Sequence, residues 1–348
     1  MKVTIKDVAK EAEVAPSTVS RVLSDNPKIS NETKLRVQEA IKKLKYRPNA
    51  IARSLANSKT RTLGVVLDSE AEDLFANPFF MQAMKGMSIC AQSMGYYIMY
   101  AFSKKGDEEL ESLTDFCTSG LVDGIVLLRV VEDDKIVSFL KERDFPFVVI
   151  GRPDDEKNSM WVDNDNFSAT YDVVHRLIEK GHRDIGFIGG KGQMNVSRYR
   201  LKGYKAALRD SDIAIDNDII CEMNNFDEEQ GYIAIKKIIS KRKVTAIVAS
   251  DDLLAFGVNK GLKEEGIEDV ALVGFNNIPL GEFQDPPLAS IDINASDLGY
   301  YAAKLLIEKL EGEVLRKLNH IVSTNFIERE SFKWKIRKSL ALDIFKNI

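Results

Sequence analysis

The sequence predicts an α/β protein built from parallel sheets, preceded by a small all-α domain. From residue 62 onward, apolar segments of strand length alternate with amphipathic helical segments, which is typical of parallel sheets covered by helices on both faces. This alternating pattern of strands and helices occurs twice along the sequence, so two similar lobes are expected. Residues 1–48 instead contain three short helical patterns separated by turns. The length of 348 residues agrees with two or three domains of roughly 100–200 residues each.

Charge is distributed unevenly between these two parts. Residues 1–61 contain 14 Lys and Arg and 6 Asp and Glu, a net charge of +8, whereas the other 287 residues carry a net charge of −12. A small basic module on an acidic body usually has a polyanion as its partner. A solvated helical surface that is rich in Lys by chance would give the same charge. The motifs within residues 1–61 must therefore distinguish a polyanion-binding module from such a surface.

Composition excludes several classes of protein. Hydrophobic residues make up 44% and charged residues 29% of the chain, as in an ordinary globular protein. The three cysteines (Cys90, Cys117 and Cys221) are widely spaced, which excludes a disulfide framework and a CxxC metal site. The charged amino terminus is unlike a signal peptide, and no apolar run approaches the ~20 residues that span a membrane. We therefore expect a cytoplasmic protein without a membrane partner.

The first two helices are predicted from capping signals. Thr4 and Asp7 can form a capping box at the start of the first helix. Pro16 is favoured at the first position of a second helix over 16–23, in which Ser17, Thr18 and Arg21 face outward. The apolar residues expected to face the core are Ile5, Val8, Ala9, Ala12, Val19 and Val22.

A third helix completes the module. Asp25-Asn26-Pro27 predicts a turn, and Ser30 can cap a helix that runs to about Lys45. Its apolar positions Leu35, Val37, Ile41 and Leu44 are expected to face the core. Two short helices joined by a tight turn, with a supporting third, form a helix-turn-helix domain. In that geometry the second helix enters the DNA major groove, where its outward amino-terminal residues meet base edges.

The amino-terminal segments VTIKDVAKEAEVAPSTVSRVL (3–23) and YRPNAIARSLA (46–56) resemble the lactose/galactose repressor family of bacterial transcription regulators. The resemblance covers residues 1 to about 335. It implies a repressor that binds palindromic operator DNA as a homodimer, because each module reads one half-site. It also implies a helix-turn-helix domain over 1–48, a hinge helix and linker over 49–60, a two-lobed effector-binding and dimerisation domain over 61–335, and a tail over 336–348.

The resemblance implies which residues of the second helix read DNA. The family residues that match Pro16, Ser17 and Arg21 approach bases, and Arg21 could give a bidentate contact to guanine worth roughly 1–3 kcal/mol of discrimination. Ala15 departs from the family's commoner hydroxyl residue before Pro16 and is a poor cap. We therefore expect the start of this helix to fray without DNA.

The resemblance also implies a hinge helix. Pro48 ends the third helix, and Asn49 can cap a segment over 50–56 that is too short to be stable alone in water. In the family this helix folds only on the operator, where the residue matching Leu55 wedges into the minor groove; packing of Leu55 on the body is the alternative. Basic residues here would contact phosphates. The candidate DNA-binding residues are Thr4, Pro16, Ser17, Thr18, Arg21, Asn49, Arg53, Leu55 and Ala56.

The body is predicted to hold strands and helices in alternation. Strands are expected at 62–67, 96–101, 124–128, 146–150, 184–188, 245–249 and 270–275. Helices are expected at about 79–94, 108–119, 134–142, 167–180, 199–210, 228–240, 252–265 and 296–311. The pattern breaks near Val162-Asp163-Asn164-Asp165-Asn166, where the second lobe should begin.

The resemblance implies that this body is similar to periplasmic sugar-binding proteins of the first type, with two lobes and one ligand cleft. Ligands in open α/β sheets lie beyond the carboxyl ends of the strands. Segments that follow strands supply the candidate effector-binding residues Asn77, Phe79, Phe80, Ser197, Arg200, Phe226, Asp227, Asp251 and Asn276. Asn276 departs from the family's usual aspartate, which weakens any charge-based argument at that position.

Each of these cleft residues has a structural alternative. Arg200 matches the family's ligand-clamping arginine, but it could instead form a structural salt bridge. The aromatic side chains Phe79, Phe80 and Phe226 could stack on a sugar or fill the core. Asp251 could bind hydroxyl groups or merely cap the following helix.

The motifs at 77–80 (NPFF), 162–166 (VDNDN), 196–200 (VSRYR) and 285–293 (DPPLASIDI) most resemble the maltose-operon repressor subgroup. The expected effector is a small sugar, maltose or a maltodextrin. Alternatives are another sugar, a global catabolite regulator that requires a phosphoprotein co-repressor, a sugar-transport protein, or an enzyme on a Rossmann-like fold. HExxH, GxSxG and P-loop motifs are absent, and the glycines of 186–192 do not fit GxGxxG, so no catalytic residue, metal or cofactor is expected.

Overall fold

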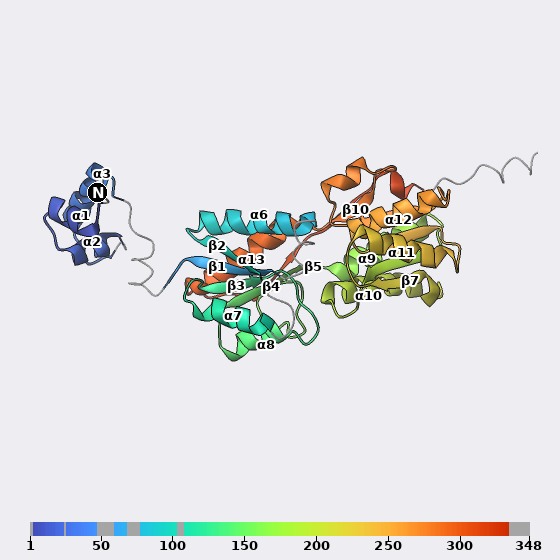
Figure 1. The fold of residues 1–348 in the computed structure, drawn as a ribbon, viewed down its shortest axis with the longest axis horizontal. Coiled ribbons are helices and arrows are strands. Elements are labelled where there is room, and N and C mark those ends of the chain that lie inside the picture. Colours follow the sequence, from blue (N-terminus) through green and yellow to red (C-terminus); the bar gives the residue numbers. More distant parts are fainter. Residues whose placement is uncertain (1–2, 24–25, 47–58, 68–76, 103–107, 334–348) are drawn as a thin grey trace, which may run out of the picture. The chain divides into compact units, whose positions relative to one another are not determined.

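The computed structural model describes residues 3–23, 26–46, 59–67, 77–102 and 108–333. The chain divides into two compact units, Met1–Arg61 and Thr62–Ile348, and each is described by itself (Figure 1).

The amino-terminal unit contains helices α1 (Ile5–Glu11), α2 (Pro16–Leu23) and α3 (Asn31–Lys43). At the start of α1, the Asp7 carboxylate accepts hydrogen bonds from the Thr4 backbone N–H and hydroxyl, each at 2.8 Å. Ser30 accepts a hydrogen bond from the Thr33 amide at 3.3 Å and so caps α3. The expected three helices and their caps are confirmed.

The three helices surround a small apolar core. Val8, Val19 and Val37 contribute one fully buried side chain from each helix, and Ile41 and Leu44 pack against this core. The expectation that Leu35 faces inward is wrong, because its side chain is 60% exposed. The buried face of α3 follows Val37, Ala40, Ile41 and Leu44, and at 100° per residue Leu35 falls on nearly the opposite side.

The body contains two parallel sheets of six strands each, and the predicted fold class is confirmed. The first sheet has the order β11-β5-β4-β3-β1-β2, and all of its pairings are parallel. Its strands are β1 (Thr62–Leu67), β2 (Tyr97–Phe102), β3 (Gly124–Leu127), β4 (Phe147–Ile150), β5 (Trp161–Asn164) and β11 (Asn319–Val322).

The second sheet has the order β12-β10-β9-β8-β6-β7, with only β12 antiparallel to its neighbour. Its strands are β6 (Ile185–Gly190), β7 (Ile220–Met223), β8 (Ala246–Ala249), β9 (Ala271–Phe275), β10 (Ala289–Asp292) and β12 (Asn325–Ile327). Strands β8 and β9 are buried along their whole length, as expected for a sheet that is covered on both faces.

Helices cover both faces of each sheet (Figure 1). In the first lobe, α6 (Pro78–Ser93) packs on α13 (Ala295–Leu310), and α7 (Glu108–Thr118) packs on α8 (Lys135–Glu142). The α6–α13 crossing is close, since a Cβ atom on Gly86 would lie 1.8 Å from the Ser296 carbonyl oxygen. In the second lobe, the helix pairs are α9 (Asn166–Glu179) with α10 (Asn195–Asp210) and α11 (Glu228–Ile239) with α12 (Asp252–Glu264).

The chain passes between the lobes at residues 164–166, 292–295 and 322–325. One buried side chain joins these crossovers: Asn164 Nδ2 donates hydrogen bonds to the carbonyl oxygens of Ile293 and Val322, at 3.0 and 2.9 Å. The predicted break near 162–166 therefore coincides with the first passage into the second lobe.

The predicted strands all occur, with ends shifted by one or two residues, but strands β5, β7, β10, β11 and β12 were not predicted. They have three or four residues each and include polar ones, as in the segments WVDN and NHIV, so apolar runs do not mark them. Helix α10 begins at Asn195 rather than at 199. The segment that was expected to be a loop before Arg200 is therefore the first turn of that helix.

Candidate functional site

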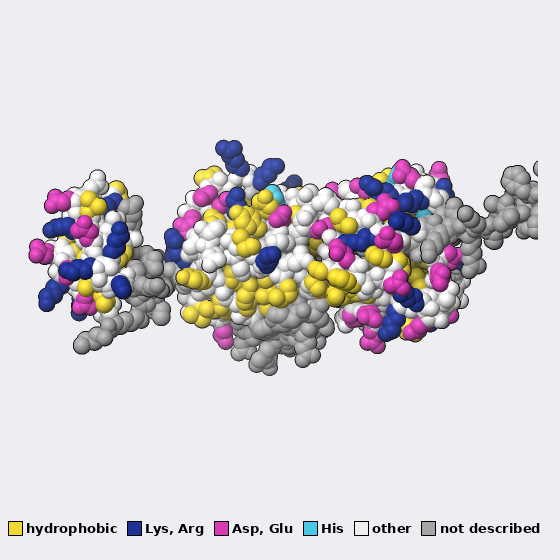
Figure 2. Space-filling model, turned by 90° about the horizontal axis from the view of Figure 1, so that it is seen from above, with side chains coloured by type: hydrophobic (Ala, Val, Ile, Leu, Met, Phe, Trp, Pro, Cys, Tyr) yellow, Lys and Arg dark blue, Asp and Glu magenta, His cyan; other side chains and the backbone are white. Residues whose placement is uncertain are grey.

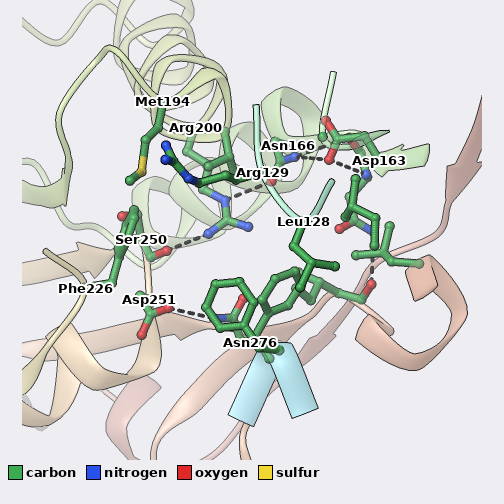
Figure 3. Close-up of a pocket in the computed structure, with 18 of the residues that line it drawn as sticks. Leu128, Arg129, Asp163, Asn166, Met194, Arg200, Phe226, Ser250, Asp251 and Asn276 are labelled. Atoms are coloured by element: carbon green, nitrogen blue, oxygen red, sulfur yellow. Dashed lines mark hydrogen bonds between the residues drawn. The ribbon is translucent and has the colours of Figure 1, made fainter. Parts of the chain in front are cut away.

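A cavity of about 160 Å³ lies between the two lobes, where strands of both sheets end (Figure 3). The first lobe contributes residues that follow β3 and β4, the end of β5 and the start of α6. The second lobe contributes residues from α9 and α10 and residues that follow β7, β8 and β9. Of the predicted effector residues, Asn77, Phe79, Phe80, Arg200, Phe226, Asp251 and Asn276 line this cavity.

Arg200 is the buried cation of the cavity wall, with only 5% of its surface exposed. Its Nε donates to Asn166 Oδ1 at 2.8 Å, and one Nη donates to the Ser250 carbonyl oxygen at 2.5 Å. The guanidinium also lies over the Phe275 ring, 4.0 Å from its centroid. Burial lowers the pKa of Arg200 to about 10 although the carboxylates of Asp251 and Asp163 favour its charged form, so it stays cationic at neutral pH.

Asp251 combines a structural and a cavity-facing position. Its Oδ1 accepts from the Leu253 amide at 2.7 Å, which caps α12. Its Oδ2 accepts from Asn276 Nδ2 at 2.7 Å and from Asn77 Nδ2 at 3.3 Å, so one carboxylate joins both lobes (Figure 3). Burial raises its pKa to about 6. Of the two alternatives for Asp251, the helix cap is confirmed, and the binding of hydroxyl groups stays a prediction.

Asp163 is a second carboxylate in the cavity wall, and it was not predicted as a site residue. Its Oδ1 accepts from the Asn164 amide at 2.8 Å and from Asn166 Nδ2 at 3.0 Å. Burial raises its pKa to about 6, against the opposing effect of Arg152 and Arg200. Its position at the carboxyl end of a polar strand was the available signal, because ligands of parallel sheets bind at that edge.

Aromatic side chains stand on both sides of the cavity. Phe79 and Phe80 come from the first lobe and pack edge to face, with ring centroids 5.0 Å apart. Phe226 comes from the second lobe (Figure 3), and Gly190 makes room for it because a Cβ there would lie 2.5 Å from its ring. These half-buried rings could cover the apolar faces of a ring-shaped ligand.

Two predicted effector residues do not line the cavity. Ser197 is buried beside Gly190 in the first turn of α10, and its neighbour Val196 lines the wall instead. Asp227 accepts a hydrogen bond from the Gln230 amide at 2.8 Å and so caps α11. Further cavity residues that were not predicted are Leu128, Arg129, Val130, Ile150, Gly151, Asn164, Asn166, Met194, Ser250, Ile293 and Leu298.

The lobes also meet beside the cavity, through the start of α10. Val131 and Met194 form an isolated β-bridge, and the Glu132 amide donates to the Gln193 carbonyl oxygen at 2.9 Å. Arg198 pairs with Asp154 at 2.6 Å and with Glu132 at 3.4 Å. These contacts join the two lobes on this side of the cavity.

The predicted DNA-contacting residues of α2 lie on its solvent side. Pro16, Ser17 and Arg21 are exposed and Thr18 is half-buried, while Val19 and Val22 face the core. Thr4 is exposed and bonded to Asp7. The predicted hinge residues Asn49, Arg53, Leu55 and Ala56 lie outside the described residues.

Comparison with known proteins identifies the family. Residues 4–49 match the bacterial regulatory proteins of the lacI family, and residues 174–332 match a periplasmic binding protein-like domain. The transcriptional regulator MalR of Streptococcus pneumoniae is 36% identical over 312 residues, which cover 88% of this chain and 93% of that protein. The chain belongs to the lacI family.

Other lacI-family proteins share the whole architecture. The transcriptional regulator CelR of Thermobifida fusca is 31% identical over 94% of this chain and 98% of its own. A solved structure of a CelR–cellobiose complex superposes with a TM-score of 0.74, at 30% identity, over 95% of this chain and 100% of that one. The protein is thus a DNA-binding transcriptional regulator of the lacI type.

The cavity wall combines charged, amide and aromatic side chains. None of the helices in the described ranges is long and apolar enough to cross a membrane. Within the same ranges, no group of three His, Cys, Asp or Glu side chains is arranged to hold a metal ion. The cavity offers two arginines, two carboxylates, amides and aromatic rings, which suit hydrogen bonding to a polar ring.

Proposed function

We propose that this protein is a repressor whose operator binding is released by a small sugar, maltose or a maltodextrin, bound in the cleft. The observation that carries the proposal is the buried trio of Arg200, Asp163 and Asp251, which faces a cavity flanked by aromatic rings. Hydroxyl groups can accept from the guanidinium and donate to the carboxylates, and ring faces can stack on Phe79, Phe80 or Phe226. Such a regulator would act in the cytoplasm.

The DNA-binding part of the proposal assigns α2 to the major groove. Ser17, Thr18 and Arg21 would meet bases and phosphates there, and Pro16 would start the helix at the DNA surface. Thr4 would contact a phosphate at the start of α1. The segment 49–60, with Asn49, Arg53, Leu55 and Ala56, would form the hinge, the domain over 61–335 would bind the effector, and 336–348 would be a tail.

A similar solved structure, that of a probable maltose operon transcriptional repressor, favours maltose as the effector. The CelR–cellobiose structure favours a different disaccharide of glucose. Both are neutral glucose disaccharides, so the same set of donors, acceptors and ring faces serves either. Comparing maltose with cellobiose in one assay separates the two assignments.

A homodimer follows from the proposed reading of a palindrome, and the body offers an apolar surface for it. Met81 and Ile89 on α6 and Tyr97 and Tyr100 on β2 are exposed, and β2 is the edge strand of its sheet. Hydrophobic side chains gather in a band across the face shown in Figure 2. Such patches mark interaction surfaces. Met81→Glu with Ile89→Glu should give a monomer by light scattering, whereas Val314→Glu at an exposed site should not.

The test of the function is fluorescence anisotropy of labelled duplexes from the gene's own neighbourhood, titrated with the full-length protein. We expect tight binding that weakens steeply as salt rises, because Lys and Arg displace counterions from phosphates. Maltose should weaken this binding, and glycerol at the same concentration should not. Failure to bind any duplex, with or without sugar, would contradict the proposal, whereas binding that responds only to cellobiose would correct the effector.

A further inference from the structure

We propose that the cleft admits uncharged, hydroxyl-rich ligands and rejects their phosphorylated forms, and that Asp163 and Asp251 determine this choice. The inference deepens the proposed function and depends on the same cleft. It concerns the chemical form in which the effector reaches the protein: a free sugar rather than a sugar phosphate.

The first support is the balance of buried charge. Four charged side chains line the cavity within the described residues: Arg129, Asp163, Arg200 and Asp251. Arg129 is exposed, whereas Asp163, Arg200 and Asp251 are 6%, 5% and 4% exposed. The buried wall therefore sets two carboxylates against one guanidinium.

A phosphate group would add negative charge to a buried wall that already has more carboxylates than cations. It carries a charge of about −1.5 to −2 at neutral pH. Repulsion between like charges is far stronger inside a protein than in water, because the effective dielectric constant is lower. A sugar hydroxyl carries no charge and can donate to either carboxylate, so it meets no such penalty.

The second support is the orientation of the Arg200 guanidinium. Arginine usually holds phosphate through two parallel N–H groups on one edge. The edge that includes Nε has lost a donor here, because Nε bonds to Asn166 Oδ1, and one Nη also bonds to the Ser250 carbonyl oxygen. Arg200 can still donate to a hydroxyl oxygen, but its Nε–Nη fork is not open to a phosphate.

The third support concerns the helix amino termini beside the cavity, which are the usual anion sites of α/β folds. Three of them already hold a side chain of the protein: Asn77 caps α6, Asp165 caps α9 and Asp251 caps α12. Helix α10 lacks a side-chain cap, but its Asn195 amide points to the Val130 carbonyl oxygen at 3.5 Å. The backbone N–H groups that would attract an anion at these helix starts are thus largely occupied by groups of the protein itself.

The acceptors offered to a neutral ligand are specific. Asp163 uses Oδ1 for both of its hydrogen bonds, so Oδ2 remains available to a hydroxyl donor within the described structure. A ligand hydroxyl that donates to Asp163 Oδ2 would give this buried carboxylate oxygen a hydrogen-bond partner.

The experiment compares matched sugars by calorimetry on the full-length protein. The pairs are maltose with maltose 6′-phosphate, cellobiose with cellobiose 6′-phosphate, and glucose with glucose 6-phosphate. At least one neutral sugar should bind, and each phosphorylated partner should bind at least about tenfold more weakly. Tighter binding of any phosphorylated member, or no binding of any neutral member, would overturn the inference.

Variants assign the discrimination to the two carboxylates. Asp163→Asn and Asp251→Asn should each reduce the neutral-over-phosphorylated affinity ratio several-fold, because each removes one buried negative charge. Asp227→Asn is the matched control: it caps α11, lies outside the cavity wall and should leave the ratio unchanged. An unchanged ratio in both cavity variants would remove these residues from the role.

Operator binding, measured in parallel by anisotropy, separates this inference from the proposed function. If a sugar phosphate binds and releases the operator, the repressor function stands and the inference on charge fails. If neutral sugars bind selectively but no operator is found, the inference stands and the proposed function fails.

Discussion

The amino-terminal helical unit and the cleft of the body place their candidate recognition residues in opposite environments. In α2, Pro16, Ser17 and Arg21 are exposed on a helix whose other face forms the core. In the cleft, Arg200, Asp163 and Asp251 are themselves almost completely buried. The candidate DNA-contacting residues of α2 therefore contribute little to the stability of their domain. The candidate effector-binding residues of the cleft contribute to both ligand binding and folding. Substitutions should therefore change binding alone in α2, but binding and folding together in the cleft.

The largest effect is expected from Arg200→Ala, which leaves Asp163 and Asp251 buried without their cation. The Asn166 Oδ1 and the Ser250 carbonyl oxygen would also lose their hydrogen bonds to Arg200, and each buried acceptor left unsatisfied costs about 1–3 kcal/mol, so the free energy of unfolding of the body should fall by that order. The response to sugar should be lost, while operator binding by the folded fraction remains. Urea unfolding and anisotropy measure the two effects.

Arg209→Ala is the matched control for that variant, because Arg209 lies on the same helix and is exposed. It should change stability by no more than about 0.5 kcal/mol. Normal stability and normal sugar response in Arg200→Ala would show that burial does not couple folding to recognition in the cleft.

A pH effect of intermediate size should distinguish the cleft from α2. Burial raises the folded-state pKa of Asp163 from 3.8 to about 6, so the folded protein holds this proton more tightly than the unfolded chain. The associated stability is fully present below about pH 4 and is lost as the pH rises to about 6. Asp163→Asn should therefore gain stability over the wild type, on the order of 1–3 kcal/mol, as the pH rises through that window.

Urea unfolding at about pH 4.5 and pH 7.5 measures this difference between Asp163→Asn and the wild type. A constant difference for Asp163→Asn across the window would mean that its carboxyl is not destabilised by burial.

Arg21→Ala tests whether a substitution in α2 changes DNA recognition without changing stability. We expect a loss of roughly 1–3 kcal/mol of discrimination at one base pair of the operator, with stability unchanged within about 0.5 kcal/mol. A panel of duplexes with single base changes measures the first quantity by anisotropy. Arg36→Ala, at an exposed site on α3, should leave base preference intact, and the same preference in Arg21→Ala would refute the reading role.

The smallest effect is expected at the contact between the lobes. Arg198 pairs with Asp154 and Glu132, but these carboxylates are about half exposed, so the pair should contribute only about 0.2–1 kcal/mol to closure. Arg198→Met should speed maltose dissociation a few-fold at low salt, and the difference should vanish at high salt as screening increases. An effect that is independent of salt would point to packing of the side chain rather than its charge.

Sequence reasoning succeeded where one signal dominated. Apolar runs such as GIVL and FVVI marked buried strands, and capping residues such as Thr4 and Ser30 marked helix starts. It failed for polar strands such as WVDN, because tertiary pairing holds them rather than hydrophobic pattern. Leu35 faces solvent although it is apolar, because its position on α3 lies opposite the buried face that Val37 and Ala40 form.

The sequence also predicted only part of the cavity wall. Arg200 and Asp251 lie in segments that the resemblance covers and both line the cavity, whereas Asp163 also lines it but lies in a segment whose pattern indicates only a boundary between lobes. Ser197 and Asp227 follow the same motifs yet lie off the cavity wall, since one turn of α10 and a helix cap direct them elsewhere. Which neighbour in a motif faces the ligand depends on helix phase, and that is set by where the helix starts.

The most direct test of the central claim compares the effect of maltose on operator binding with the effect of operator DNA on maltose binding. Coupling by linkage requires that maltose weaken operator binding by the same factor by which operator DNA weakens maltose binding. Anisotropy gives the first factor, and calorimetry of maltose with and without saturating operator gives the second. We predict equal factors, both well above one. Tight operator binding that is unaffected by saturating maltose, or by any other sugar that fills the cleft, would contradict the account.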